Sequence, residues 1–477
     1  MKKIFALSFF LMACLLFAGA QKQWSLEDCI NYALTNNVDV KQQMLSISMG
    51  EQDVLNDKLN LLPSLNGYAS HGYNWGQAID PYTNEFATKR VGTDNFYLSA
   101  SWVLFNGFQK SNTLKQDQLN LQATRYAVDK FMDDVSMSIA AAYLQILYNT
   151  ELLKVATGQL DITRQQVERT RKMVEAGTLA RGDLLLVESQ AATEELNVVN
   201  TQNNIDISIL TLTQLLDLPS AEGFAIEEPD VSILKNPRSP LSPDEVYAFA
   251  NTTQPDVKSA ELKLKSSEKT LSLARGTLSP NLYISGSYGT GYSGAAKDYS
   301  QGIDPFTQPP IQIGNTASGE AVYSLPQYLY TDYKIILFDK QLSDNQNKSV
   351  MLHLSIPIFN GWMARTNIAK AKIGIESASY TLATTRLNLR KNIQQAYADA
   401  VASLKSYAAA EKKVTATTES FKYADQKFNV GLINSVDYNE AKKELTAAQA
   451  ELLQAKYDYL FKNLILEFYM GKPLTLK

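Results

Sequence analysis

The sequence is poor in the residues that carry most enzyme and metal chemistry. Its 477 residues include two cysteines and two histidines. So few cysteines exclude a disulfide framework and a cysteine-rich metal site. The histidines, His71 and His353, leave little for a histidine-based active site. The formal net charge is −4, whereas a nucleic-acid-binding surface needs a basic surplus, so we expect no nucleic-acid partner.

Catalytic and cofactor motifs are also missing. The sequence contains no G-x-G-x-x-G after an expected strand, no P-loop, no H-E-x-x-H and no G-x-S-x-G. We therefore expect no catalytic residue, no cofactor and no metal, and an enzyme is the least favoured class. The pairs Asp80-Pro81 and Asp304-Pro305 are interpreted as turn formers and not as metal ligands.

Long hydrophobic runs are limited to the beginning of the chain. Two lysines precede an apolar run from Ile4 to Phe17, which is followed by Ala18-Gly19-Ala20. This order is typical of a secretory signal, and the run is shorter than the roughly 20 residues that span a bilayer. We predict a signal peptide at 1–20, the alternative being a lipoprotein signal that uses Cys14. The mature chain would be either soluble outside the cytoplasm or a β-barrel.

The rest of the chain is an internal repeat. Pairs in register are Asp28 with Glu245, Pro63 with Pro280, Tyr143 with Tyr397, Gly177 with Gly431 and Pro219 with Pro473. The only change in length falls between Tyr288 and Val350, where the second copy has a longer loop. The predicted domains are a first structural repeat at 21–219, a connector at 220–242, a second repeat at 243–473 and a tail at 474–477. A register held over this length indicates duplication.

Each repeat is expected to contain long helices. The blocks 107–218 and 361–472 lack proline and are rich in good helix formers. At 1.5 Å per residue, a helix from Gly107 to Ala176 would be about 105 Å long. The shorter segments Leu26 to Leu62 and Asp183 to Asp217 would each form a helix of roughly half that length. Their narrow apolar stripes are typical of helices packed side by side in a coiled layer.

Strands are expected between the helices. Around residues 94–107, apolar side chains alternate with Tyr97, Ser99 and Ser101, and 350–358 alternates in the same phase. The partner segments begin at Ser64 and Asn281. A soluble four-stranded sheet is the alternative to a membrane barrel. Because an open edge is not tolerated in lipid, four strands per chain require several chains, and three chains would enclose an aqueous lumen.

The secretory signal, the repeat, the strand endings LFNG and IFNG and the glycine turns resemble the TolC family of outer-membrane channel proteins. The resemblance covers Leu26 to Pro473. It implies an α+β membrane protein in which four transmembrane strands per chain complete a homotrimeric 12-stranded β-barrel. A long periplasmic α-helical barrel would continue it, with the connector and the tail in an equatorial band. Partners would be outer-membrane lipid, a periplasmic adaptor and, indirectly, an inner-membrane transporter.

The resemblance also assigns roles to the turns between long and short helices. Gly177 and Thr178 in one copy match the turns where an adaptor docks. Val430, Gly431 and Leu432 match them in the other copy. In both turns we expect glycine to end the long helix, and Asp183 or Asp437 to cap the next one.

A tunnel constriction is the second role that the resemblance implies. Asp437 and Glu440 match the positions of the family's acidic constriction, and their spacing places them on one side of a helix. The family's gating arginine is absent, since Ile433 stands at its position, and Arg181 in the other turn is a candidate replacement.

The expected function is a passive exit duct of a tripartite efflux system in the bacterial outer membrane, which conducts small toxic molecules from the periplasmic tunnel to the exterior. One alternative is the outer-membrane duct of a type I protein secretion system. An alternative of another class is a secreted coiled-coil structural or adhesive protein without a pore.

Overall fold

The computed structural model describes residues 23–87, 90–229, 241–298, 306–308, 310–325, 327–329 and 333–476. The predicted signal peptide, Cys14, Asp304-Pro305 and residues 230–240 of the predicted connector lie outside the described residues. What the sequence indicates for those segments, and for the domain boundaries, therefore stays a prediction.

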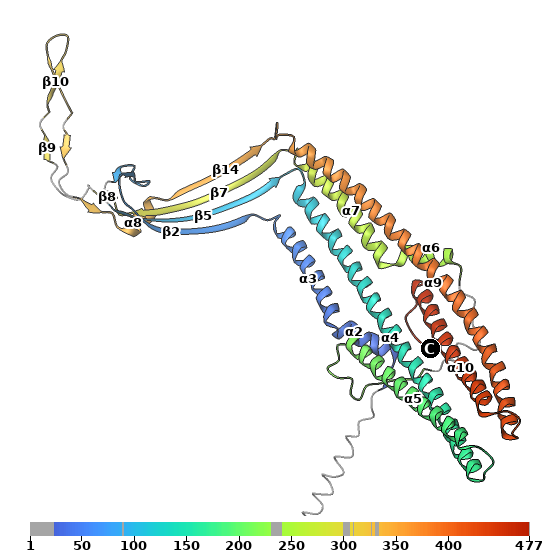
Figure 1. Ribbon diagram of the computed structural model, residues 1–477. Coiled ribbons are helices and arrows are strands. Elements are labelled where there is room, and N and C mark those ends of the chain that lie inside the picture. The colour runs from blue at the N-terminus through green and yellow to red at the C-terminus, as the bar shows by residue number, and fades with distance from the viewer. Residues whose placement is uncertain are drawn as a thin grey trace, which may run out of the picture. The chain divides into compact units, whose positions relative to one another are not determined.

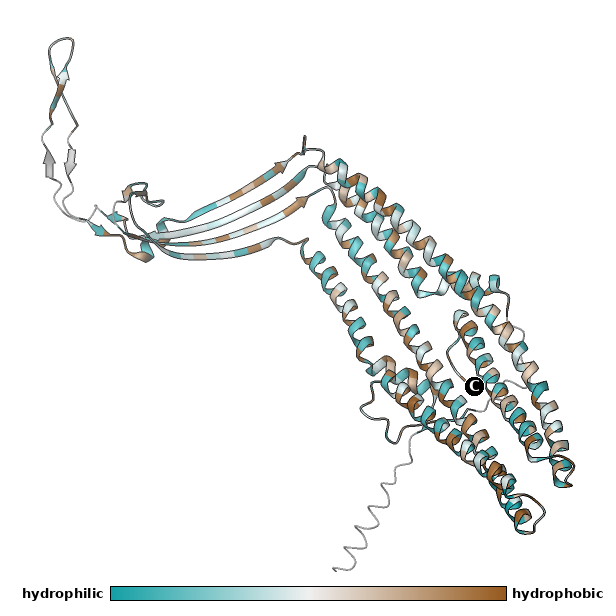
Figure 2. Cartoon of the chain, viewed as in Figure 1, coloured by the Kyte–Doolittle hydropathy of each residue, from teal (hydrophilic) through white to brown (hydrophobic). Residues whose placement is uncertain are grey.

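The chain folds into two compact units. The helical unit contains the described residues within Met1–Gln52, Gln116–Ser267 and Ile373–Lys477, and the sheet unit those within Asp53–Lys115 and Glu268–Lys372. Figure 2 shows hydrophilic and hydrophobic residues interspersed along the helices. Within the described ranges, no helix combines the length and the apolar composition that crossing a membrane would require.

The helices occur in two series with the same lengths in the same order (Figure 1). The first series is α2 (Leu26–Asn36), α3 (Val38–Leu59), α4 (Gln109–Glu175) and α5 (Arg181–Leu215), with 11, 22, 67 and 35 residues. The second is α6 (Pro243–Thr253), α7 (Pro255–Gly276), α9 (Met363–Asn429) and α10 (Ser435–Tyr469), again with 11, 22, 67 and 35 residues. The repeat seen in the sequence is therefore matched by the lengths of the helices.

Each series begins with the same local structure. Ser25 caps α2 and Ser242 caps α6, and the acid three residues later, Asp28 or Glu245, completes a capping box. The prediction of one helix from Leu26 to Leu62 is wrong, because the chain leaves the helical conformation at Asn37. The Asn37 side-chain oxygen instead accepts hydrogen bonds from the amides of Asp39 and Val40, which restarts the helix as α3.

The sheet unit contains the four predicted strands. They are β2 (Ser64–Asn74), β5 (Val91–Phe105), β7 (Asn281–Ser293) and β14 (Asn347–Ser355), in the order β14-β7-β5-β2. All three pairings are antiparallel. Both outer strands, β2 and β14, leave one edge without a partner within this sheet (Figure 1).

The loops that follow β2 and β7 are also structured where they are described. Asp80 accepts hydrogen bonds from the amides of Tyr82 and Thr83 and from the Ser293 hydroxyl. The turn-forming role predicted for Asp80-Pro81 is therefore confirmed. The loop after β7 contains α8 (Phe338–Asp344) and short strand pairs, including β10 (Gln312–Asn315) with β11 (Ala321–Tyr323).

The largest core of the helical unit surrounds Tyr143 of α4, which is 1% exposed. Its hydroxyl donates a hydrogen bond to the Glu227 carbonyl at 2.6 Å, and the Trp24 carbonyl lies 3.1 Å away. Trp24 belongs to a short parallel pair of strands, β1 (Gln23–Trp24) with β6 (Ala225–Ile226), and Glu227 follows β6 directly. Leu474 and Leu476 are buried in the same cluster. Phe224 and Ile226, at the start of the connector, pack against the same cluster, so this end of the connector and the tail belong to one core.

Candidate functional site: the two helix–helix turns

Both predicted turn glycines end a long helix in the left-handed conformation, with φ of +76° at Gly177 and +77° at Gly431. The Gly177 amide donates to the Val174 carbonyl and the Thr178 amide to the Met173 carbonyl, at 3.0 and 2.9 Å. The turn after α9 repeats this pattern around Gly431. This pair of hydrogen bonds defines a Schellman motif, which satisfies carbonyls at the helix end. The predicted role of glycine is confirmed at both positions.

We expect substitution of Gly431 by alanine to cost about 1–2 kcal/mol of unfolding free energy, because a Cβ disfavours positive φ. An added Cβ would meet nothing within 4 Å, so the cost comes from the backbone alone. Thermal unfolding of Gly431→Ala measures it. Gly158 in α4 also has open space around it but lacks a positive φ. Gly158→Ala should therefore be neutral or stabilising, and equal losses in both variants would contradict this explanation.

The predicted aspartate caps are wrong. Ala180 precedes α5 at the N-cap and makes no side-chain hydrogen bond, and Asp183 is the third helical residue. The N-cap of α10 is Asn434, whose side-chain oxygen accepts from the amides of Val436 and Asp437 at 2.9 Å. Asn434 is the residue directly before α10, so its side chain occupies the N-cap position, whereas Asp437 is already part of the helix. The aspartates remain in the first turn, where a negative charge is favourable to the helix dipole.

The two turns enclose a shared pocket of about 440 Å³. Its lining residues come from both turns and from the adjoining ends of α4, α5, α9 and α10: Thr170, Met173, Leu179, Asp183, Phe428, Gly431, Leu432, Ile433, Asn434, Ser435 and Asp437. The structure therefore brings Gly431, Leu432 and Asp437 together beside Asp183 of the other repeat. Val430 and Leu432 are 70% and 74% exposed, so the turn presents apolar side chains to its surroundings.

Asp437 and Glu440 are both exposed, while Ser435 and Tyr438 of the same helix start are buried. The two carboxylates thus lie on the outer side of α10, as their spacing predicts. Tyr438 packs against Phe428 with 4.8 Å between ring centroids. Burial, reinforced by the carboxylate of Asp425, raises the pKa of Tyr438 to about 12.

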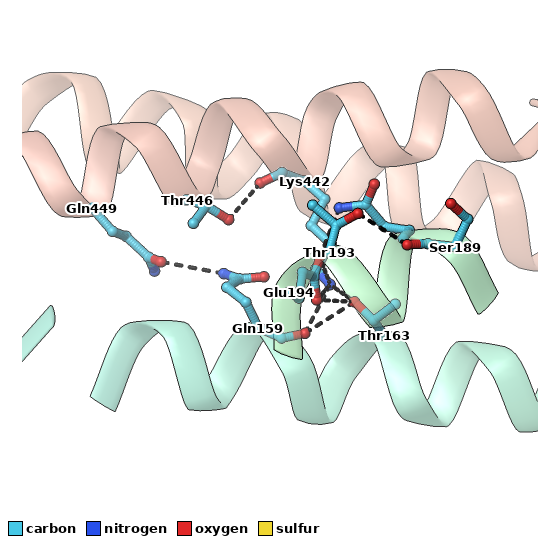
Figure 3. Close-up of polar contacts among 9 residues, drawn as sticks. Gln159, Thr163, Ser189, Thr193, Glu194, Lys442, Thr446 and Gln449 are labelled. Carbon is cyan, nitrogen blue, oxygen red and sulfur yellow. Dashed lines mark hydrogen bonds and ion pairs between the residues drawn. The ribbon is translucent and has the colours of Figure 1, made fainter. Parts of the chain in front are cut away.

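A buried ion pair lies further along α10 and was not predicted from the sequence (Figure 3). Lys442 is 3% exposed. Its ammonium group donates to both carboxylate oxygens of Glu194 in α5, at 3.1 and 3.2 Å, and to the Gln159 carbonyl in α4 at 2.8 Å. It also donates to the Thr163 hydroxyl. Burial lowers the pKa of Lys442, and Glu194 opposes that shift. This cluster joins a helix of the second repeat to two helices of the first.

The only sequence feature that points to this cluster is the spacing of Lys442 from buried residues of the same helix. Lys442 follows Tyr438 by four residues and precedes Leu445 by three, and both of these are buried. A lysine inside such a stripe needs a partner, because lysine is rarely buried without one. Among the described residues, no group of three or more His, Cys, Asp or Glu side chains could hold a metal ion.

Comparison with known proteins identifies relatives of this chain, both in sequence and in fold. The sequence profile of the outer membrane efflux protein family matches residues 29–217 and 247–472. The outer membrane protein TolC of Escherichia coli is 23% identical over 434 residues, which are 89% of this chain and 78% of TolC. The outer membrane efflux protein BepC of Brucella suis is 19% identical over 458 residues, covering 96% of this chain and 87% of BepC.

Solved structures show the same architecture. The outer membrane protein VceC of Vibrio cholerae superposes with a TM-score of 0.74 at 15% identity, over 94% of this chain and 96% of VceC. The MtrE outer membrane channel of Neisseria gonorrhoeae gives a TM-score of 0.71 at 18% identity, over 95% of this chain and 90% of MtrE. At these identities the likeness establishes the fold, a helical domain joined to a β domain.

Proposed function

Since the chain belongs to the outer membrane efflux protein family, we propose that it is the exit duct of a tripartite efflux system, conducting small toxic molecules from a periplasmic tunnel to the exterior. The predicted resemblance and the predicted efflux function in the bacterial outer membrane are confirmed by this family match. A secreted coiled-coil protein is no longer favoured. As a member of a family of channel proteins, the chain would catalyse no reaction itself.

The sheet supports a homotrimer. Its two edge strands, β2 and β14, need partners in lipid, and the next copies of the chain would supply them. Three copies give twelve strands, whereas two copies would give a barrel filled by side chains. Exposed apolar residues on α9 recur at heptad spacing, at Ile373, Tyr380 and Leu387, and each is at least 65% exposed. A neighbouring copy would cover this stripe.

The turns support docking of a periplasmic adaptor. Gly177, Thr178, Val430, Gly431 and Leu432 would form the contact surface, with Val430 and Leu432 as exposed apolar anchors. Two glycine-ended Schellman turns hold these residues in a fixed conformation, which reduces the ordering cost of binding. This surface is the observation that carries the proposal of a tripartite assembly.

The tunnel constriction would be formed by Asp437 and Glu440. Three copies of the pair would place six carboxylates around the tunnel mouth and favour cations there. Both side chains are exposed, so they can face the tunnel. Ile433 lines the pocket between the turns, where the family's gating arginine would stand.

A photo-crosslinker at Leu432 in living cells tests the docking proposal. We expect it to capture a periplasmic adaptor, identified by mass spectrometry, because this side chain is exposed at the turn. An adaptor encoded beside a proton-driven multidrug pump would support small-molecule efflux, and one encoded beside an ATP-driven exporter would support protein secretion. A crosslinker at Tyr380 is the control and should capture a second copy of this chain. Capture at Tyr380 with no adaptor at Leu432 would refute docking at the turns.

A further inference from the structure

One face of the four-stranded sheet carries many small hydroxyl side chains. Residues paired directly across neighbouring strands lie on the same face. Ser99 of β5 pairs with Asn66 of β2 and with Ser287 of β7, which pairs with Ser349 of β14. The hydroxyls of Ser287 and Ser349 are 2.6 Å apart. Hydroxyl and amide side chains thus form a row across the whole sheet, and we call this side the serine face.

The described strands contribute one histidine and no other acidic or basic side chain to the serine face. The nearest carboxylate against this face is Asp80 of the loop after β2, which accepts from the Ser293 hydroxyl ten residues along β7 from Tyr283. The serine face consists of every second residue of the four described strands, counted from Ser64, Val91, Asn281 and Asn347. None of these residues is Asp, Glu, Lys or Arg, and His353 is the exception. The opposite face holds the leucines and isoleucines of the strands, and the charges of Asp94 and Lys348 lie on it. In a membrane barrel the apolar face meets lipid and the polar face lines the lumen.

His353 lies on β14 among groups without charge. Its ring stacks on Tyr283 of β7 with 4.4 Å between centroids, and Nε2 lies 3.0 Å from the Ser285 hydroxyl. Its neighbours on the same face of β14 are Met351 and Ser355. The free edge of β14 would meet β2 of the next copy, whose serine face offers Tyr68 as its titratable group. The titratable groups facing the imidazole are therefore phenols.

We propose that His353 makes the charge of the lumen wall around β14 depend on pH, because it is the one Asp, Glu, Lys, Arg or His side chain on the serine face of the described strands. This inference rests on the proposed function, because the trimeric barrel turns one histidine per chain into a set of three. Imidazole is the side chain that gains charge between pH 8 and pH 5. Acid outside the cell would therefore hinder cationic molecules beside β14 and help anionic ones.

A cysteine at Met351 reports the local potential. Met351 is 52% exposed and lies two residues from His353 on the same face, about 7 Å along the strand. Cells carrying Met351→Cys would be labelled at low ionic strength with an anionic and a cationic methanethiosulfonate. The ratio of their rates cancels the thiolate fraction. Between pH 8 and pH 5.5 we expect the anionic-to-cationic ratio to rise about fivefold. Cys29 is fully buried and should stay unlabelled.

Each histidine supplies a matched variant. His353→Gln, which keeps a hydrogen-bonding group near Ser285, should abolish the rise in the rate ratio. His71 is on the opposite face, with its Nδ1 2.6 Å from an Asp94 carboxylate oxygen, and His71→Gln should leave the rise unchanged. A rise that survives His353→Gln, or a ratio that is flat in the otherwise unchanged chain, overturns the assignment to His353.

The experiment separates this inference from the proposed function. Leu352→Cys places the thiol on the apolar face, and a barrel predicts that lipid shields it while Met351→Cys is labelled. If both cysteines are labelled, or if neither is, the barrel itself is wrong and the inference fails with it. If Met351→Cys alone is labelled but its rate ratio does not change with pH, the duct stands and the role of His353 does not.

Discussion

Glu194→Ala should lower the free energy of unfolding by about 3–5 kcal/mol, because it leaves the ammonium group of Lys442 buried without its counter-charge. Lys442 retains hydrogen bonds to the Gln159 carbonyl and the Thr163 hydroxyl, but neither carries a charge. Circular dichroism of the helices during thermal unfolding, in detergent, measures the loss. If Glu194→Ala unfolds at the same temperature as the unchanged chain, water must reach Lys442 and the expected loss is refuted.

The neighbouring residue provides the control. Glu195 pairs with Arg164 at 3.1 Å, and these side chains are 62% and 58% exposed. Glu195→Ala should cost about 1 kcal/mol or less, because exposed ion pairs contribute little. Replacing both buried partners, as Glu194→Leu with Lys442→Met, should restore most of the stability, since two apolar side chains remove the buried charge altogether. Similar losses at Glu194 and Glu195 would argue against a special role for the buried pair.

Tyr143→Ala should cost about 3–5 kcal/mol, as expected for removing a fully buried aromatic ring. The ring lies in the core that joins α2, α4, α5, α10 and the tail. Tyr143→Phe keeps the ring and removes the hydrogen bond to the Glu227 carbonyl, so about 1–2 kcal/mol should be lost. The same unfolding experiment measures both changes.

The internal repeat supplies the comparison for this prediction. Tyr397 occupies the position in α9 that matches Tyr143, but it is half-buried at the edge of a smaller cluster. Tyr397→Ala should therefore cost clearly less than Tyr143→Ala. Equal losses of unfolding free energy in Tyr143→Ala and Tyr397→Ala would mean that the core around Tyr143, which includes part of the connector and the tail, adds nothing to the contribution of this tyrosine.

Much of the fold could be predicted because the sequence contains two copies of one structural repeat, which can be compared with each other. The register that pairs Gly177 with Gly431 predicts matching helices, and period-two alternation around Ser99 predicts the strands. The break at Asn37 could not be predicted in this way. Asparagine is compatible with a helix interior, and its capping role depends on a side chain that bonds the following amides.

The candidate site was predicted less completely. Glycine at Gly177 and Gly431 predicts the turns, since few other residues tolerate their positive φ. The caps were misassigned because aspartate and asparagine both cap helices, and spacing alone does not choose between Asn434 and Asp437. Lys442 was missed because a lysine at helical spacing is normally exposed, and only the positions of Glu194 and Thr163 reveal its burial.

The equal lengths of the paired helices restrict how this protein can evolve. One residue inserted into α4 or α9 would turn every later side chain by about 100° around the helix axis. An insertion between Gln159 and Thr163 would move the two residues that bind Lys442 out of line with each other. The chain should therefore tolerate insertions and deletions in the loop between β7 and β14, where its two halves already differ in length, and reject them inside the four longest helices.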